Sequence, residues 1–217
     1  MTKALILIRP LLSTAVLALL VAAAGRDRDS ISVAYLGLFG VLGVATALAA
    51  GKSHVSERIW GSDDGADPGV RLLGSSLFLA TVTVAAFDSG RFQWNPTLPG
   101  ALRVAALATL VLFGSLRVWA MAVNPFFSPS LWIQPRHRLV ARGPYRFLRH
   151  PGYLAMLVTT PAASIALGSL AGLLPALGYE FLILRRAMRE DDLLREKLGG
   201  YAEYAGTVRC RIVPGLW

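Results

Sequence analysis

The sequence predicts an all-α protein, a polytopic membrane helix bundle of about six transmembrane helices, or five if the last helical hairpin is shallow. Of its 217 residues 54% are hydrophobic and only 16% are charged, and the mean hydropathy is +0.53. This composition is too apolar for a soluble domain of the same length. Several apolar runs also reach the roughly 20 residues that a helix needs to cross a hydrocarbon layer about 30 Å thick. We therefore expect an integral membrane protein.

Four apolar runs each have the length of one span, at residues 4–24, 31–50, 70–87 and 101–123. They are rich in Ala, Leu, Val and Gly, and small residues at helical spacing allow helices to approach closely. We expect residues 1–123 to form a four-helix transmembrane scaffold without chemistry of its own. The first run also resembles a cleaved signal peptide, but further spans follow it and we expect it to be retained.

The next apolar region, residues 153–184, is longer than a single span. It is interrupted by Pro161, Gly168, Gly172 and Pro175, which favours two helices in a tight hairpin over one long helix. We expect a separate polar helix to follow, beginning at Arg185 and ending at the glycine pair 199–200.

Charge predicts how the chain is oriented. The net charge is +9, and 12 of the 22 Lys and Arg residues fall in the segments 136–149 and 185–211. By the positive-inside rule both segments are cytoplasmic, and six spans place both termini there as well. We expect a bacterial cytoplasmic membrane protein. Because topology and anionic headgroups account for the basic residues, they do not indicate a nucleic-acid partner. The oligomeric state is left open.

No metal site is predicted. Cys210 is the single cysteine of the chain, which excludes an intrachain disulfide and argues against a Cys-based metal site. The carboxylates Asp63, Asp64 and Asp67 lie in the polar connector 52–69, but no further ligand at suitable spacing joins them, and we interpret the connector as a solvated loop.

Residues suited to ligand binding or catalysis gather just before the hairpin. Pro151 suits the first turn of a helix, so His150 is expected at a helix N-terminus, where free N–H groups and the helix dipole favour a carboxylate or phosphate. Arg146 and Arg149 add charge-assisted donors. Because a hairpin returns the chain to the same membrane face, the acidic cluster 190–192 can meet these residues. Together they predict a pocket that carries both signs of charge.

The same residues resemble a known family. The run Gly-Pro-Tyr-Arg-Phe-Leu-Arg-His-Pro-Gly-Tyr at residues 143–153 is followed by the apolar hairpin, Glu-Asp at 190–191, Tyr-x-x-Tyr at 201–204 and Val-Pro-Gly at 213–215. This order is similar to that of the isoprenylcysteine carboxyl methyltransferase and phospholipid methyltransferase family of membrane enzymes. The resemblance implies methyl transfer from S-adenosylmethionine to a lipophilic acceptor dissolved in the membrane, for example an isoprenylcysteine carboxylate. It makes residues 124–217 the catalytic, cofactor-binding region, with a cytoplasmic C-terminal helix.

The resemblance also implies which residues carry the site. Those expected to bind the cofactor are Tyr145, Arg149, His150, Pro151, Tyr153, Glu190 and Asp191, and the catalytic ones are Arg146, Arg149 and Glu190. We expect His150 and Tyr153 to hold the cofactor carboxylate, and Glu190 its amino or ribose end. Arg146 or Arg149 would orient an anionic acceptor. The departures from the family pattern are Asp191, where a second Glu is usual, Ala155, where Gly is usual, Leu198, where Phe is usual, and one residue that is missing before Tyr201. An alternative register would place Arg189 and Glu190 on the acidic pair.

The residue types in the C-terminal region suit the charged groups of S-adenosylmethionine. S-adenosylmethionine carries a carboxylate, an ammonium and a sulfonium, so its site needs cationic or N–H donors, acidic groups and aromatic faces together. The C-terminal region supplies all three kinds of group.

Other interpretations remain open. Taken singly, Arg146 and Arg149 suit interfacial topology determinants, His150 a helix cap, and Tyr201 and Tyr204 interfacial aromatics. Arg117 and Glu180, inside predicted spans, could pair with each other, line a pocket, or reach the interface by snorkelling. The alternative functions are an NADPH-dependent membrane reductase of the sterol reductase type and a non-catalytic lipid-binding membrane protein.

Overall fold

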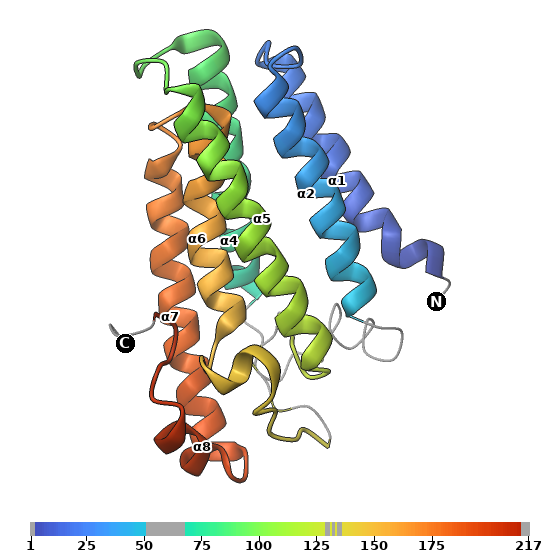
Figure 1. Ribbon diagram of the computed structural model, residues 1–217, viewed down its shortest axis with the longest axis vertical. Helices are drawn as coiled ribbons and strands as arrows, with labels where there is room; N and C mark the ends of the chain where they lie inside the picture. The colour runs from blue at the N-terminus through green and yellow to red at the C-terminus, as the bar shows by residue number, and fades with distance from the viewer. Residues whose placement is uncertain (1–2, 51–67, 129–130, 132, 134–135, 214–217) are drawn as a thin grey trace.

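The computed structural model describes residues 3–50, 68–128, 131, 133 and 136–213, so the connector expected at 52–69 lies almost wholly outside the described residues. The described chain is helical and contains no strand. Six long helices form the bundle shown in Figure 1: α1 (Lys3–Ala23), α2 (Ser30–Ala49), α4 (Pro68–Phe87), α5 (Gly100–Val123), α6 (Pro151–Leu167) and α7 (Leu173–Lys197). A π-helical turn η1 (Asp88–Phe92), a 3-10 turn η2 (Gly143–Arg146) and the short helix α8 (Tyr201–Thr207) complete it.

Among the described residues, three helices are long and apolar enough to cross a membrane by length and composition: Ser30–Ala49, Gly69–Phe92 and Gly100–Val123. Two shorter apolar helices, Leu7–Ala23 and Pro151–Leu167, accompany them. Each of the four apolar runs expected in the first half of the chain coincides with a helix to within a few residues. The all-helical membrane architecture predicted from the sequence is therefore confirmed, while the number of spans remains a prediction.

The hairpin is present, and only some of its expected interruptions act as breaks. α6 ends where Gly168 adopts a left-handed backbone with φ of 91°, and α7 begins directly after Gly172. Gly172 permits a close approach, because a Cβ there would lie 2.4 Å from Ser164 Oγ and 2.9 Å from the Thr81 carbonyl oxygen. Pro161 and Pro175, by contrast, lie inside α6 and α7.

The separate polar helix expected to begin at Arg185 is wrong. α7 runs without a break from Leu173 to Lys197, so the acidic residues belong to the second helix of the hairpin. No Gly or Pro occurs between Tyr179 and Leu198, and nothing in the sequence stops the helix where its polarity changes. The change in polarity at Arg185 divides one continuous helix into an apolar first half and a polar second half. As a result the acidic residues lie on the same continuous helix as the apolar second half of the hairpin.

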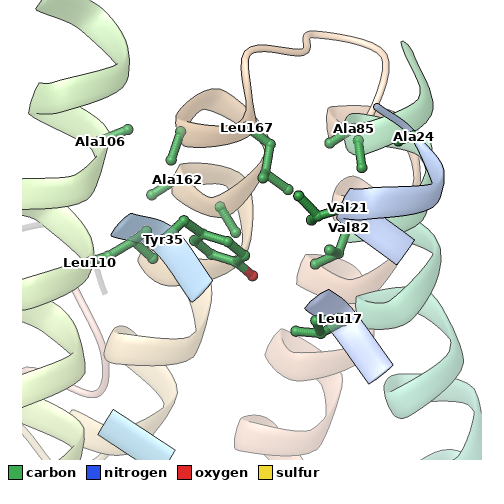
Figure 2. Close-up of a cluster of buried hydrophobic side chains, with 13 residues drawn as sticks. Leu17, Val21, Ala24, Tyr35, Val82, Ala85, Ala106, Leu110, Ala162 and Leu167 are labelled. Carbon is green, nitrogen blue, oxygen red and sulfur yellow. The ribbon is translucent and has the colours of Figure 1, made fainter. Parts of the chain in front are cut away.

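A cluster of buried apolar side chains lies toward the hairpin end of the bundle. Figure 2 shows Leu17 and Val21 of α1, Tyr35 of α2, Leu110 of α5 and Leu167 of α6 converging there with a group of alanines. The alanines Ala85, Ala86, Ala106, Ala162, Ala163 and Ala166 are buried in the same cluster. Small side chains let backbones approach closely, which favours helix association in lipid.

Two polar networks close the hairpin end. Arg103 of α5 is 7% exposed, donates through Nε to the Ala166 carbonyl at 2.9 Å, and pairs with Asp29, which caps α2 by accepting from the Ser32 amide at 2.8 Å. Asp88 accepts from the Trp94 amide at 2.7 Å and from Ser169 Oγ at 2.6 Å. Both networks fasten loops between helices and lie at the opposite end from the residues of the predicted site.

We expect Arg103→Met to destabilise the bundle without changing ligand affinity. Removing one partner of a largely buried ion pair costs up to about 3 kcal/mol. Among the described residues, Asp29 would keep only Arg26 as a cationic partner, 3.2 Å away. Thermal unfolding in detergent measures the effect, and Arg28→Met, an exposed arginine in the same loop as Asp29, is the matched control. Equal melting temperatures for the two variants would contradict this role for Arg103.

Candidate functional site

The predicted motif lies at the start of α6, beside the polar half of α7 and the short helix α8 (Figure 1). Pro151 is the first residue of α6 and His150 is its N-cap residue, with φ −129° and ψ 62°. This is the position that the proline predicted. Arg149, His150 and Pro151 are all buried, so they lie within the fold and do not form a solvated interfacial patch.

The C-terminal segment holds the motif in place through its backbone. The amide of Arg149 donates to the Cys210 carbonyl at 3.0 Å, and the amide of His150 donates to the Arg211 carbonyl at 2.9 Å. Ile212, directly after this segment, is fully buried. These contacts join residues about 60 positions apart, and no local sequence pattern indicates them.

Asp191 is the centre of a buried ionic cluster. Its side chain is 0% exposed, and both carboxylate oxygens lie 2.8 Å from Arg149 Nη1. Its other partners are Tyr201 Oη at 2.7 Å, Arg195 Nε at 3.0 Å, Arg211 Nε at 3.1 Å and His150 Nε2 at 3.2 Å. A buried carboxylate is stable only when it is paired and hydrogen-bonded in this way. Asp191 thus joins α6, α7, α8 and the C-terminal segment.

The surroundings keep this cluster in one protonation state. Burial alone would raise the pKa of Asp191, but the hydrogen bonds from His150, Tyr201 and Arg195 outweigh it and hold that pKa below its ordinary value. Burial raises the pKa of Tyr204 to about 12, and raises that of Tyr201 further with help from Asp191. At neutral pH Asp191 is therefore ionised, and both tyrosines keep their protons and act as donors.

Glu190 has a different environment from its neighbour. The Tyr153 hydroxyl donates a hydrogen bond to Glu190 Oε2 at 2.5 Å, and Arg186 Nε donates a hydrogen bond to the same Tyr153 oxygen at 3.0 Å. Successive residues of a helix point about 100° apart, so Asp191 faces the buried cluster while Glu190 faces an open cavity. The two acids of the pair are thereby separated into different environments.

This cavity has a volume of about 1160 Å³ and gathers most of the residues expected from the sequence. Its walls include Tyr145, Arg149, His150, Pro151, Tyr153 and Glu190, together with Tyr201 and Tyr204. Asp191 is not among the wall residues. Arg146 is exposed, with its guanidinium carbon 6.0 Å from the centre of the Phe147 ring, and it does not line the cavity either.

Several residues of the site were not singled out from the sequence. Arg195 lies four residues after Asp191 on one helix, a spacing that could have indicated its ion pair. Arg186, Arg211 and Phe127 offered no comparable signal. Phe127 packs against the start of α6 because Gly152 has no side chain: a Cβ there would lie 2.4 Å from the Phe127 ring.

Comparison with known proteins adds one finding to this geometry. No curated protein matches the chain. Residues 106–196 match the model of the isoprenylcysteine carboxyl methyltransferase (ICMT) family, a stretch that runs from α5 through η2 and α6 to the last turn of α7. It contains Arg149, His150, Tyr153, Glu190 and Asp191, which the structure brings together. The resemblance seen in the sequence is thus confirmed: residues 106–196, somewhat less than half of the chain, are similar to the isoprenylcysteine carboxyl methyltransferase family.

Proposed function

We propose that the protein transfers a methyl group from S-adenosylmethionine to a lipophilic acceptor that enters from the membrane. The observation that supports this most strongly is the cavity itself. Its polar end holds Arg149, His150, Tyr153 and Glu190, and its remaining wall includes apolar side chains of helices that belong to the membrane, among them Phe39, Phe78 and Met121. One cavity therefore offers both a polar cofactor region and an apolar acceptor region.

The residues present fit the proposed cofactor. Glu190 offers a carboxylate to an ammonium group or to ribose hydroxyls, and Tyr201 and Tyr204 place aromatic rings in the same wall. Among the described residues, Arg149 Nε is buried and has no hydrogen-bond partner, which leaves one donor of this guanidinium for a ligand carboxylate. An unsatisfied buried donor is costly and needs an explanation, which a bound anion provides.

Each side chain then has a distinct task. S-adenosylmethionine supplies a methyl carbon activated by its sulfonium. Glu190 binds the cofactor, and Tyr153 orients the Glu190 carboxylate by hydrogen bonding, itself held by Arg186. Asp191 positions Arg149 and His150. Holding the reacting groups in near-attack geometry can supply much of the rate enhancement of such a displacement.

This assignment changes the expected roles of three residues. Tyr153 acts through Glu190, and Asp191 is a positioning residue. Arg149, which lines the cavity, is the better candidate than Arg146 for binding an anionic group. We keep the division into a scaffold at 1–123 and a catalytic region at 124–217, with six spans. In this topology both termini and the site face the cytoplasm of a bacterial cell.

We expect Tyr153→Phe to weaken binding of S-adenosylhomocysteine, the demethylated cofactor, about tenfold, because Glu190 loses a hydrogen bond worth about 1.5 kcal/mol. Isothermal titration of the purified protein measures the affinity. The matched control is Tyr35→Phe, since Tyr35 is buried in the apolar core and its hydroxyl has no partner among the described residues. Unchanged affinity in the Tyr153 variant would remove this residue from the site.

A further inference from the structure

The connection between α4 and α5, residues 88–99, carries large aromatic side chains on the outside of the protein. Phe92 is 55% exposed and Trp94 is 63% exposed. Figure 1 shows this connection at the end of the bundle that holds the turn between α6 and α7, opposite the candidate site. It also lies before the stretch 106–196 that matches the family, so the match gives it no role.

The exposed rings contact one another. Phe92 and Trp94 stack with their ring centres 4.9 Å apart and only 5° between the ring planes. Phe92 also stacks on Phe87, with 6.2 Å between the ring centres. The guanidinium carbon of Arg91, an exposed residue, lies 6.0 Å from the centre of the Phe87 ring. These four residues, which we name the aromatic cluster, form one apolar surface that carries one positive charge.

The backbone beneath the aromatic cluster is held in place by contacts with distant parts of the chain. Asp88 is 1% exposed, and it accepts from the Trp94 amide at 2.7 Å and from Ser169 Oγ at 2.6 Å. Gly90 packs against the end of α1, because a Cβ there would lie 2.0 Å from the Ala24 carbonyl oxygen. The connection is therefore fastened to α1 and to the turn between α6 and α7 without any partner.

The helices on either side place this connection at a membrane surface. Gly69–Phe92 and Gly100–Val123 each have 24 residues and are long and apolar enough to span a membrane. A helix of this length extends about 36 Å, which exceeds a hydrocarbon layer about 30 Å thick. The facing ends of both helices therefore reach the headgroup layer, and so do the residues that join them.

The chemistry of the aromatic cluster suits this layer. Aromatic rings, tryptophan above all, are favoured where an apolar body can meet hydrocarbon and a polar tip can meet water. Arginine can lay its apolar stem on such a surface and extend its charge to phosphate groups. A loop exposed to water alone would leave the stacked Phe92 and Trp94 rings hydrated, which is unfavourable.

We infer that the aromatic cluster is a preformed anchor in the headgroup layer of the membrane, with Phe92 and Trp94 at the hydrocarbon boundary and Arg91 reaching lipid phosphate groups. The inference goes beyond the proposed function, because it concerns the opposite end of the bundle and requires neither cofactor nor acceptor. It assigns a lipid surface as the partner of this connection.

Depth-dependent quenching of Trp94 fluorescence tests the anchor. The other four of the five tryptophans are replaced by phenylalanine, and circular dichroism establishes that the protein is folded. The protein is placed in vesicles of equimolar phosphatidylcholine and phosphatidylglycerol that carry nitroxide labels on the headgroup or at different depths of the acyl chain. We expect Trp94 at about 15 Å from the bilayer centre, the edge of a hydrocarbon layer about 30 Å thick.

A matched control reports the middle of the membrane. Leu112 is 66% exposed and lies halfway along α5, so Leu112→Trp combined with Trp94→Phe places the single tryptophan within a spanning helix. We expect this tryptophan near the bilayer centre, with strongest quenching by the deepest label. If the four phenylalanine substitutions unfold the protein, the difference between the unsubstituted protein and Trp94→Phe alone reports the same signal.

Three outcomes would overturn the inference. Quenching of Trp94 by aqueous iodide but by no lipid label would place the aromatic cluster in water. Protection from both iodide and lipid labels would mean that a protein surface, such as a second copy of this chain, covers it. A depth equal to that of the Leu112→Trp control would place it within the hydrocarbon.

The contribution of Asp88 has a separate test in the same vesicles. Asp88→Asn replaces a carboxylate oxygen by an N–H group, so the side chain can no longer accept from all of its present donors. We expect greater iodide quenching of Trp94 in the folded variant, because the connection is no longer held. Ser169→Ala, which removes one of these hydrogen bonds, is the milder variant if Asp88→Asn does not fold. Unchanged quenching in the folded variants would contradict a preformed anchor.

Discussion

Replacing Asp191 by asparagine is expected to abolish binding of S-adenosylhomocysteine and to lower the free energy of unfolding by about 3–5 kcal/mol, the cost of breaking a buried ion pair. Asp191 has no exposed surface, and its carboxylate is shared by Arg149, Arg195 and Arg211. Without its negative charge these guanidinium groups repel one another. The two backbone bonds that hold the C-terminal segment against Arg149 and His150 would then lose their support.

Thermal unfolding and ligand titration on the same preparations measure both effects. Asp192→Asn is the matched control, because Asp192 is the next residue on α7 and is exposed, so we expect a change within about 0.5 kcal/mol. Asp191→Glu restores the residue usual in the family pattern and should keep more activity than the asparagine variant. An Asp191→Asn protein as stable as the Asp192 control would contradict the buried cluster.

The same cluster predicts how stability depends on pH. The folded pKa of Asp191 lies below its unfolded value of about 3.9, so its contribution is complete above about pH 5 and is lost as the pH falls toward the folded value. The Asp191→Asn variant should therefore lose less stability than the unsubstituted protein over that acid range.

Replacing Glu190 by glutamine is expected to weaken S-adenosylhomocysteine binding about 100-fold, since a hydrogen bond to a charged group in a partly buried site is worth up to about 3 kcal/mol. Unlike Asp191, Glu190 is half-buried and lines the cavity, so we expect the fold to survive. Glutamine has the same shape and can still accept from Tyr153. A loss of affinity with unchanged stability would therefore show that the negative charge of Glu190 contributes to ligand binding.

The matched control for this change is Glu196→Gln, which removes an exposed carboxylate from the same helix. Isothermal titration gives the affinities, and turnover with a membrane extract as acceptor gives the rates. Equal affinity for the Glu190 and Glu196 variants would exclude Glu190 as a cofactor ligand.

The sequence predicted the helices well because lipid imposes a strong length and composition rule on each span. The break at Gly168–Gly172 was also predictable, since glycine there permits a left-handed residue and a close approach of backbones. The predicted start of a separate polar helix at Arg185, by contrast, was wrong, because α7 continues through that residue. Hydropathy changes along a continuous helix as readily as between two helices, so a change in polarity alone does not locate a helix end.

The sequence predicted the motif residues of the candidate site, but it did not predict the contacts that hold them together. The order of Arg149, His150 and Glu190 along the chain indicated a shared site through the hairpin. Nothing local indicated that Arg211 would pair with Asp191, because that contact depends on the path of the chain after α8. The different environments of Glu190 and Asp191 likewise follow from the orientation of α7 in the bundle. Their adjacent positions in the sequence do not reveal that difference.

The most direct test of the proposed function is thermal unfolding of the purified, detergent-solubilised protein during titration with S-adenosylhomocysteine and, separately, with NADPH. A ligand that binds only the folded state must raise its stability, by about 2.7 kcal/mol when its concentration is about 100 times the dissociation constant. We predict stabilisation by S-adenosylhomocysteine alone, and its loss in the Glu190→Gln variant. Stabilisation by NADPH instead, or by neither compound in a protein shown to be folded, would contradict the account.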